Sequence, residues 1–265
     1  MERHSKAGRK RREHVCCKYS GADQYCLKRE EFGSANHDQG SYGSHVVWSA
    51  KNLHVLPDGL ESSLAGPLLC GGATVWGALV TSGGRPVVAG DVVGVVGIGG
   101  LGHLAIQFAE KLGATVIAFS STDSKREEAL GFGASEFYAT KGVTKFDEKL
   151  VKKIDHLLIT TSELPDFDLY LPIIASLGVI HPLTVGFDKT PVPMLPVVVE
   201  GRSIQGSATA PHLQVQKMLE FSARFGVKPQ TQEWPMTAEG IEGIEGALKT
   251  LADGQMRYRG VVVAQ

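Results

Sequence analysis

A glycine-rich turn between two apolar segments constrains the fold of this chain of 265 residues more than any other feature. Residues 92–96, VVGVV, form a short apolar run typical of a central parallel strand. Residues 97–102, GIGGLG, follow with the spacing G-x-G-x-x-G, and the pattern then predicts a helix over 101–112 and a strand over 115–119. A strand, a glycine turn, a helix and a second strand in this order predict a parallel βαβ unit that binds a dinucleotide.

The glycines of this turn are Gly97, Gly99, Gly100 and Gly102. They let the backbone approach a pyrophosphate closely, while N–H groups at the positive end of the following helix hold its charge. Further apolar segments predict a strand over 154–160, a helix over 167–175 and a strand over 179–185. This alternation predicts an α/β fold with a doubly wound parallel sheet.

The end of the second strand decides which nicotinamide cofactor the sequence favours. An NAD site usually has an acidic residue there, about 20 residues after the glycine turn, which accepts hydrogen bonds from the ribose hydroxyls. Here Ser120 occupies that place, and Lys125 and Arg126 follow it. A small hydroxyl and positive charge leave room for a 2′-phosphate, so the sequence predicts NADP(H). Asp123 is the discordant residue, and it would weaken this preference if its carboxylate faced the site.

Composition argues against several classes of partner. The chain has 27 Lys and Arg against 28 Asp and Glu, a net charge of -1, which argues against nucleic acid as the main partner. Residues 1–12 carry six basic side chains and one acidic side chain, and we expect a disordered tail there. No apolar stretch of a secretory signal follows this tail. We therefore expect a cytoplasmic protein that does not associate with a membrane.

Five segments together carry a resemblance to a known family. They are residues 65–76, AGPLLCGGATVW; 94–114, GVVGIGGLGHLAIQFAEKLGA; 124–130, SKREEAL; 201–207, GRSIQGS; and 256–263, MRYRGVVV. With these motifs the chain resembles the zinc-dependent medium-chain alcohol dehydrogenases, and within them the NADP-dependent cinnamyl alcohol dehydrogenase branch. The resemblance implies a Rossmann cofactor domain and a GroES-like, β-rich catalytic domain, with the site in the cleft between them.

The resemblance also implies an activity. Family members interconvert a primary or secondary alcohol and its carbonyl compound by hydride transfer to or from NADP(H). A catalytic zinc with three protein ligands and one open position binds the alcohol oxygen as a Lewis acid. The partner implied is a small-molecule alcohol or aldehyde. A homodimer is also implied, with residues 192–199 as the candidate interface.

The family's functional residues transfer to matching positions of this sequence. Cys70, in PLLCGG, matches a ligand of the catalytic zinc, and Thr74 matches a residue near the nicotinamide. Gly97, Gly99, Gly100, Leu101 and Gly102 match the pyrophosphate loop; Ser120, Ser121 and Lys125 match the 2′-phosphate group; Ser207 and Arg259 lie in motifs that line the cofactor cleft. Cys17 and Cys26 match the last two ligands of a structural zinc lobe, although eight residues separate them instead of seven.

The family's first two catalytic zinc ligands have no counterpart in this sequence. A Cys followed by Ser or Thr and a Gly-His-Glu motif are both missing. One thiolate cannot hold a catalytic zinc. We therefore expect a catalytic domain that is incomplete at its N-terminal side. The predicted division is a basic tail over 1–12, a GroES-like remnant over 13–69, a Rossmann NADP-binding domain over 70–208 and a return to the catalytic domain over 209–265.

Three hypotheses for the function remain open at this point. The first is an NADP(H)-dependent alcohol dehydrogenase or aldehyde reductase. The alternative is a catalytically impaired remnant that binds NADPH but has no catalytic zinc site. The third is a zinc-free oxidoreductase of the quinone reductase type, against which Cys70 within PLLCGG argues, because zinc-free proteins do not need that thiolate.

Overall fold

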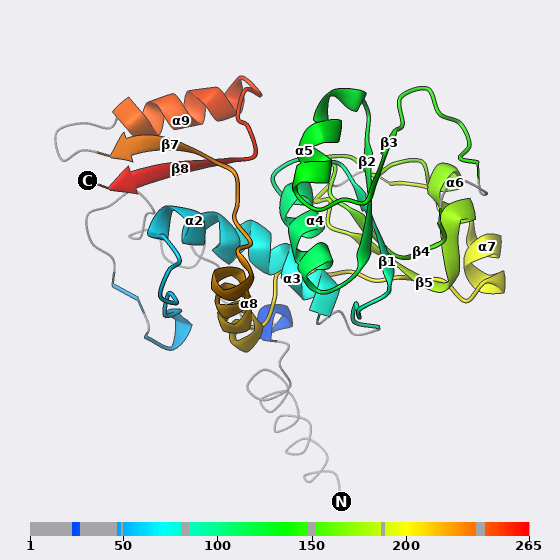
Figure 1. The fold of residues 1–265 in the computed structure, drawn as a ribbon, viewed down its shortest axis with the longest axis horizontal. Helices are drawn as coiled ribbons and strands as arrows, with labels where there is room; N and C mark the ends of the chain where they lie inside the picture. The colour runs from blue at the N-terminus through cyan, green and yellow to red at the C-terminus, as the bar shows by residue number, and fades with distance from the viewer. Residues whose placement is uncertain are drawn as a thin grey trace, which may run out of the picture.

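The structure, a computed structural model, describes residues 23–26, 47–48, 50–80, 85–147, 152–186, 189–236 and 242–264. Its strands are β1 (Val92–Val96), β2 (Thr115–Ser120), β3 (Glu136–Ala139), β4 (Ile154–Ile159), β5 (Ile174–Pro182), β6 (Ser203–Ile204), β7 (Thr231–Met236) and β8 (Arg259–Ala264). Its helices are η1 (Asp23–Tyr25), η2 (Ala50–Asn52), α2 (Ser62–Pro67), η3 (Leu68–Gly72), α3 (Ala73–Val80), α4 (Gly102–Lys111), η4 (Asp123–Lys125), α5 (Arg126–Gly131), α6 (Phe167–Tyr170), η5 (Leu171–Ile173), α7 (Met194–Val199), α8 (His212–Phe225) and α9 (Glu242–Ala252). In Figure 1, β1 to β5 and their helices form one body, and β7, β8 and α9 form a smaller one. α2 lies below β7 and β8, and α8 lies below the region between the two bodies.

Six strands form one parallel sheet in the order β3-β2-β1-β4-β5-β6. β1 lies at its centre, where Val93 is opposite Val116 of β2 and His156 of β4. β1 and β2 are apolar and almost wholly buried, as expected for central strands that helices cover on both faces. The strand order reverses between β1 and β4, and folds of this kind bind ligands at the carboxyl ends of the strands at that point. The predicted doubly wound sheet is therefore confirmed.

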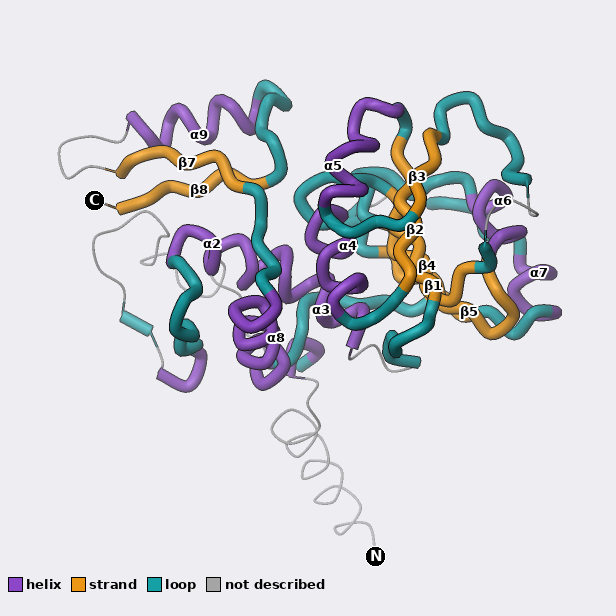
Figure 2. Tube along the Cα trace, viewed as in Figure 1, coloured by secondary structure: helices purple, strands orange, loops and turns teal. Residues whose placement is uncertain are grey.

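Helices cover both faces of this sheet (Figure 2). On one face α3, α4 and α8 pack in a cluster that includes Val93, Leu104 and Leu219. On the other face α6 and α7 contribute Phe167 and Val197 to a second cluster. Side chains alternate between the two faces along each strand, so the apolar strands supply both clusters.

One continuous helical stretch, formed by α2, η3 and α3, runs from Ser62 to Val80. It has the length and mean hydropathy, 1.4, of a membrane-spanning helix, but 61 % of its most apolar window is buried inside the fold. Gly77 lies so close to the backbone of Thr209 that a β-carbon would come within 2.0 Å of the carbonyl oxygen. The stretch is therefore a core helix of this fold. The domain boundary predicted at residue 70 falls within it and, like the other boundaries, stays a prediction.

A separate two-stranded parallel sheet contains β7 and β8, and α9 packs against both strands. Two parallel strands need a crossover connection, and α9 lies in the segment that provides it. β8 begins at Arg259, beside the larger body (Figure 1). This strand therefore delivers Tyr258 and Arg259 to the region between the two bodies.

The segment before β5 differs from its predicted structure. Instead of a helix over 167–175, α6 ends at Tyr170, the short helix η5 follows, and β5 begins at Ile174. Pro172 removes a backbone donor from the helix, and the β-branched residues after it favour a strand. Periodicity alone does not distinguish a buried helix from a buried strand in a short apolar run. Here the pairing with β4 makes the segment from Ile174 onward a strand.

Candidate functional site

The glycine turn lies at the carboxyl end of β1 and leads directly into α4. Gly97 has a φ of 89°, a conformation that residues with a side chain rarely adopt. A β-carbon at Gly102 would lie 1.9 Å from the carbonyl oxygen of Gly97, so the two ends of the turn touch each other. Gly99 faces open space, since a β-carbon there would meet nothing within 4 Å. The turn is thus closed on its inner side and has room for an anion beside Gly99.

Two residues predicted to contact the cofactor hold carbonyl groups of this turn. Lys125 Nζ donates a hydrogen bond to the carbonyl oxygen of Ile98 at 2.7 Å. Arg259 Nε donates to the carbonyl oxygen of Gly100 at 3.1 Å. The ammonium group of Lys125 also lies 5.4 Å from the centroid of the Tyr258 ring, and burial lowers its pKa. Residues far apart in the sequence therefore meet at the glycine turn.

Ser120 is the last residue of β2, and the exposed Ser121 follows it. The carbonyl oxygen of Ser120 accepts the N–H of Thr140 at 2.8 Å, which holds the strand end in place. The N–H of Gly97 donates to the carbonyl oxygen of Phe119, also at 2.8 Å. These bonds place Ser120 at the carboxyl edge of the sheet, next to the glycine turn.

Arg126 binds the carboxylate of Asp123, the residue whose negative charge would oppose the 2′-phosphate of NADP(H). Its Nε donates to the two carboxylate oxygens at 3.0 and 3.1 Å, and its Nη2 donates at 2.6 Å. These hydrogen bonds lower the pKa of the Asp123 carboxyl. Arg126 also donates to the carbonyl oxygen of Phe137 at 3.2 Å. The Asp123 charge is therefore compensated. Of the two neighbouring cations Lys125 and Arg126, it is Lys125 that contacts the glycine turn.

Cys70 lies in a π-helical turn, η3, that joins α2 and α3. The residue is exposed, and the Thr74 hydroxyl donates to its carbonyl oxygen at 2.9 Å. The neighbouring Gly71 contacts Arg259, since a β-carbon at Gly71 would lie 2.5 Å from Nη2 of that guanidinium. Because Arg259 also bonds to Gly100, the structure brings the Cys70 turn and the glycine turn together. Single π-turns of this kind occur frequently at functional sites.

The other predicted site residues are Ser207, Cys26 and Cys17. Ser207 is half-buried between β6 and α8, and no hydrogen bond in the described part of the chain links it to the glycine turn. Cys26 is half-buried beside η1. Cys17 lies outside the described residues, so the structural zinc lobe stays a prediction.

Zinc, which the resemblance implies, needs three protein ligands at a catalytic site. In the described ranges, no three His, Cys, Asp or Glu side chains are grouped so that they could hold a metal ion. Cys70 is a single candidate ligand there. The described residues do not fit a catalytic zinc, and we assign no chemical step to one.

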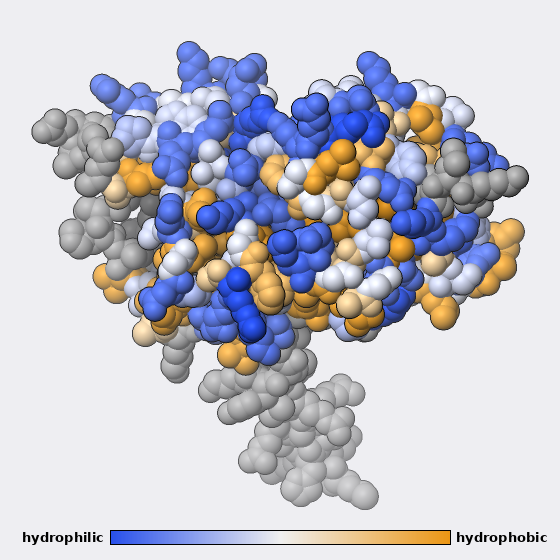
Figure 3. Space-filling model, in the orientation of Figure 1, coloured by the Kyte–Doolittle hydropathy of each residue, from blue (hydrophilic) through white to orange (hydrophobic). Residues whose placement is uncertain are grey.

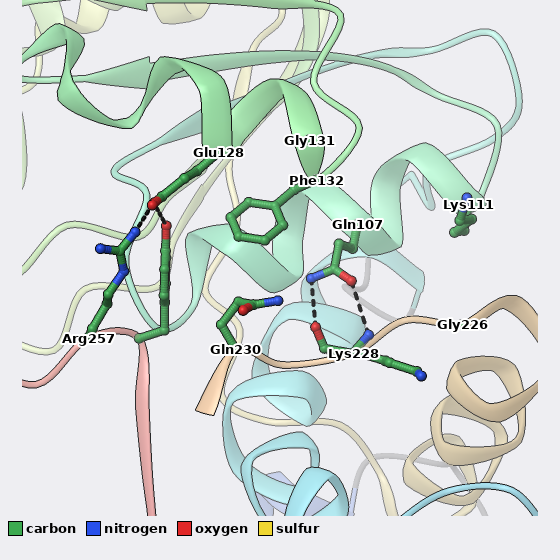
Figure 4. Close-up of a pocket in the computed structure, with 10 residues that line it drawn as sticks. Gln107, Lys111, Glu128, Gly131, Phe132, Gly226, Lys228, Gln230 and Arg257 are labelled. Atoms are coloured by element: carbon green, nitrogen blue, oxygen red, sulfur yellow. Dashed lines mark hydrogen bonds and ion pairs between the residues drawn. The ribbon is translucent and has the colours of Figure 1, made fainter. Parts of the chain in front are cut away.

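Two polar residues of α4 that the sequence patterns did not single out join this helix to the segment before β7. His103 is fully buried; its Nδ1 lies 2.9 Å from the carbonyl oxygen of Gly99, and the N–H of Gln230 donates to its Nε2 at 3.1 Å. Burial lowers the pKa of His103 to about 4. Gln107 exchanges two hydrogen bonds of 3.0 Å with the backbone of Lys228 (Figure 4). The signal in the sequence is the spacing of four between these two polar residues, which places them on the same face of the helix.

A pocket of about 490 Å³ lies beside α4 and α5 (Figure 4). Its lining consists of Gln107, Lys111, Glu128, Gly131, Phe132, Gly226, Lys228, Gln230, Arg257 and Tyr258. Glu128 forms an ion pair with Arg257 and accepts the hydroxyl of Tyr258. None of the glycines of the turn lines this pocket, so it is separate from the open space at Gly99.

Comparisons with known proteins find similarity to dehydrogenases. Residues 100–224 match a family model described as zinc-binding dehydrogenase. The chain is 33 % identical over 258 residues to a probable formaldehyde dehydrogenase, AdhA, of Bacillus subtilis, covering 91 % of this chain and 71 % of that protein. It is 33 % identical over 223 residues to NADP-dependent alcohol dehydrogenase C 1 of Mycolicibacterium smegmatis, covering 82 % and 62 %. A solved cinnamyl alcohol dehydrogenase from Sorghum bicolor superposes with a TM-score of 0.65 at 30 % identity, covering 79 % of this chain and 57 % of that one. The chain thus spans 57 to 71 % of the length of these three proteins.

Proposed function

The chain belongs to the zinc-type medium-chain alcohol dehydrogenase family, and on that premise we propose that it binds NADP(H) and interconverts an alcohol and its carbonyl compound. The observation that carries the proposal is a glycine turn that is open at Gly99, with Ser120 in place of an acidic residue at the end of β2. The names of relatives support it, since one is an NADP-dependent alcohol dehydrogenase and another a cinnamyl alcohol dehydrogenase.

The residues at the site have separable roles in holding the cofactor. N–H groups of the glycine turn and the positive end of α4 would hold the pyrophosphate. Ser120, Ser121 and Lys125 would hold the 2′-phosphate, because two hydroxyls and an ammonium donate to phosphate oxygens and no unpaired carboxylate opposes them. Arg259 links the glycine turn to the turn that carries Cys70 and Thr74, so the nicotinamide end is expected there.

NADPH, when bound, supplies a hydride from the nicotinamide to the carbonyl carbon, and the carbonyl oxygen takes up a proton, which yields the alcohol and NADP⁺. The chain's contribution is to position these groups. Thr74 is on α3, one helical turn after Cys70, so both residues lie on the same side of the helical stretch. They are the residues that we expect beside the reacting carbon.

Ser120→Asp is expected to reverse the cofactor preference. The native protein should bind NADPH more tightly than NADH, and the new carboxylate should weaken NADPH binding by about tenfold or more, or ~1.4 kcal/mol, because it repels the 2′-phosphate. The same carboxylate accepts hydrogen bonds from the ribose hydroxyls of NADH and should strengthen its binding. Titration of the purified protein with each cofactor, followed by nicotinamide fluorescence, measures both effects.

The matched control is Asp123→Asn, which removes a carboxylate that is already paired with Arg126. This variant should keep the native ratio of the two dissociation constants. Equal affinity of the native protein for NADPH and NADH would disprove the proposed role of Ser120 and Lys125.

A second candidate function is NADPH binding without hydride transfer. It is favoured by the described residues, which offer a single candidate ligand, Cys70, where a catalytic zinc needs three. Assay of the full chain with NADPH, added zinc and a panel of aldehydes separates the two functions. NADPH oxidation that depends on the aldehyde supports the enzyme, whereas tight NADPH binding without turnover supports the second candidate.

We also propose that the protein forms a homodimer through the edge of the large sheet. Among the described residues, the edge strand β6 pairs with β5 alone, and α7 next to it exposes Leu195 and Val199 by 75 % and 71 %. Figure 3 shows hydrophobic residues at this end of the molecule, where α7 lies. A sheet edge beside exposed apolar side chains is a surface that a second copy can cover.

Replacing both Leu195 and Val199 of α7 by Glu should convert the dimer into a monomer, because two buried charges without partners oppose association. Sedimentation velocity of native and variant protein measures the change. Leu213→Glu on α8, where the side chain is 72 % exposed, is the control and should leave the oligomeric state unchanged. A native protein that sediments as a monomer at all concentrations would contradict the proposal.

A further inference from the structure

His103 is the second residue of α4 and is fully buried, although its side chain is polar. The N–H of Gln230 donates to Nε2, so Nε2 carries no proton. The proton of the neutral ring is therefore on Nδ1, which donates to the carbonyl oxygen of Gly99 at 2.9 Å. Both ring nitrogens have partners, and these partners select one tautomer.

His103 is one of three side chains that hold consecutive carbonyl groups of the glycine turn. Lys125 holds the carbonyl of Ile98, His103 holds that of Gly99, and Arg259 holds that of Gly100. In a trans peptide the C=O and the N–H of the next residue point in opposite directions. Each side chain that holds a carbonyl therefore also orients the N–H that follows it.

The N–H groups oriented in this way belong to Gly99, Gly100 and Leu101. None of them donates a hydrogen bond to another group in the described part of the chain. A polar N–H without a partner is satisfied by water or by a ligand. Three such donors, beside the open space at Gly99 and before the positive end of α4, fit an anion such as a pyrophosphate.

We propose that His103 is a positioning residue of the cofactor site, which through its Nδ1–H and the Gly99 carbonyl aims the N–H of Gly100 at the pyrophosphate. This inference rests on the proposed function of NADP(H) binding. Lys125 and Arg259 are cations that attract the phosphates directly, so replacing them changes charge as well as geometry. His103 is neutral, because burial lowers its pKa to about 4. Its replacement therefore tests loop geometry without changing the charge of the site.

Two amide variants separate the two hydrogen bonds of His103. In His103→Asn the amide nitrogen lies near the position of Nδ1 and can still donate to Gly99. In His103→Gln the amide reaches the position of Nε2 and keeps the bond from Gln230, but the side-chain donor to Gly99 is lost. The backbone N–H of residue 103, which donates to the same carbonyl at 3.1 Å, stays in both variants, so the comparison isolates the side-chain bond. Both variants remove a buried ring, so both should lower the unfolding temperature.

Gln107→Leu is the matched control on the same helix. It breaks both hydrogen bonds between α4 and Lys228 and a third, of 3.1 Å, to the backbone carbonyl oxygen of His103, but it leaves both bonds of the His103 ring in place. It should lower the unfolding temperature of the full chain, yet leave the dissociation constant of NADPH at its native value.

The experiment is a titration of the full-length native protein and the three variants with NADPH, together with thermal unfolding. We expect the dissociation constant to rise about tenfold in His103→Gln and by about threefold or less in His103→Asn, because one hydrogen bond to the loop contributes on this scale. Equal losses in the two amide variants, or the same loss in Gln107→Leu, would reduce His103 to a structural residue and overturn the proposal.

A cofactor-free measurement keeps this test separate from the proposed function. Long-range proton–nitrogen correlation spectra of the native protein should show the His103 ring protonated at Nδ1 and unchanged between about pH 5.5 and 8. A ring protonated at Nε2 would overturn the role of His103 whatever the protein binds. A native protein with the Nδ1 proton that fails to bind NADPH would instead overturn the proposed function.

Discussion

Gly102→Ala is expected to abolish measurable NADPH binding and to lower the stability of the whole sheet. A β-carbon at this position would lie 1.9 Å from the carbonyl oxygen of Gly97 and 2.9 Å from the Thr160 hydroxyl. Neither group can withdraw easily, since Thr160 donates to that carbonyl at 2.7 Å. The overlap would push α4 away from β1, and overpacking of this kind costs about 1–3 kcal/mol or more. Thermal unfolding and NADPH titration measure the two losses.

Two further glycine variants show whether the lost stability and NADPH binding come from the overlap with the Gly97 carbonyl or from any glycine-to-alanine replacement. Gly131→Ala, at the end of α5, meets no atom within 4 Å and should bind NADPH normally. Gly99→Ala also meets no atom of the chain, so it should fold normally, but its methyl group would occupy the space proposed for the pyrophosphate. Native NADPH affinity in Gly102→Ala would contradict the closed geometry of the turn.

The sequence predicted those parts of the fold that depend on local pattern. The β-branched run before the glycine turn, the apolar face of the next helix and the second strand all appear within a few residues of their predicted bounds. Each of these elements is specified by neighbours in the chain: buried strands by continuous apolar residues, and the turn by glycines that no other residue replaces at φ 89°. The choice of Ser120 as the strand end followed from the same local spacing.

The parts that the sequence could not predict depend on contacts between distant residues. Arg259 bonds to Gly100 across 159 positions, and Gln230 bonds to His103 across 127. The spacing of four between His103 and Gln107 does not reveal that His103 is buried, because two polar residues on one helix face are as consistent with a surface position as with a buried one. The sequence also did not predict the ion pair between Asp123 and Arg126. Residues three positions apart can form an ion pair on a helix, but the spacing does not require one.

Two buried histidines in the middle of the sheet make the stability of the protein sensitive to acid. His156 Nδ1 and His181 Nε2 lie 3.2 Å apart, and both rings are fully buried. His156 Nε2 lies 3.4 Å from the Asp91 carboxylate, which Arg85 also contacts. Burial lowers the pKa of both histidines, that of His181 to about 3, and the neighbouring His156 lowers the latter further. The carboxylates of Asp91 and Asp155 raise the pKa of His156, but they do not compensate for the removal of the two rings from water.

Lowering the pH from 7 to 5 is therefore expected to reduce the free energy of unfolding by about 2 kcal/mol through His181 alone. The pKa of His181 is lower in the folded chain than in the unfolded chain, so the unfolded chain binds its proton first. The stabilisation is complete above the unfolded pKa of about 6.5, falls as the pH drops, and levels off only near the folded pKa of about 3. His181→Gln keeps a hydrogen-bonding partner for His156 but does not titrate. Urea unfolding of native and variant protein at several pH values measures the difference, in which the contributions of groups that do not interact with His181 cancel. The variant should lose about 2 kcal/mol less than the native protein over this range, whereas parallel curves for the two proteins would show that His181 does not link protons to folding.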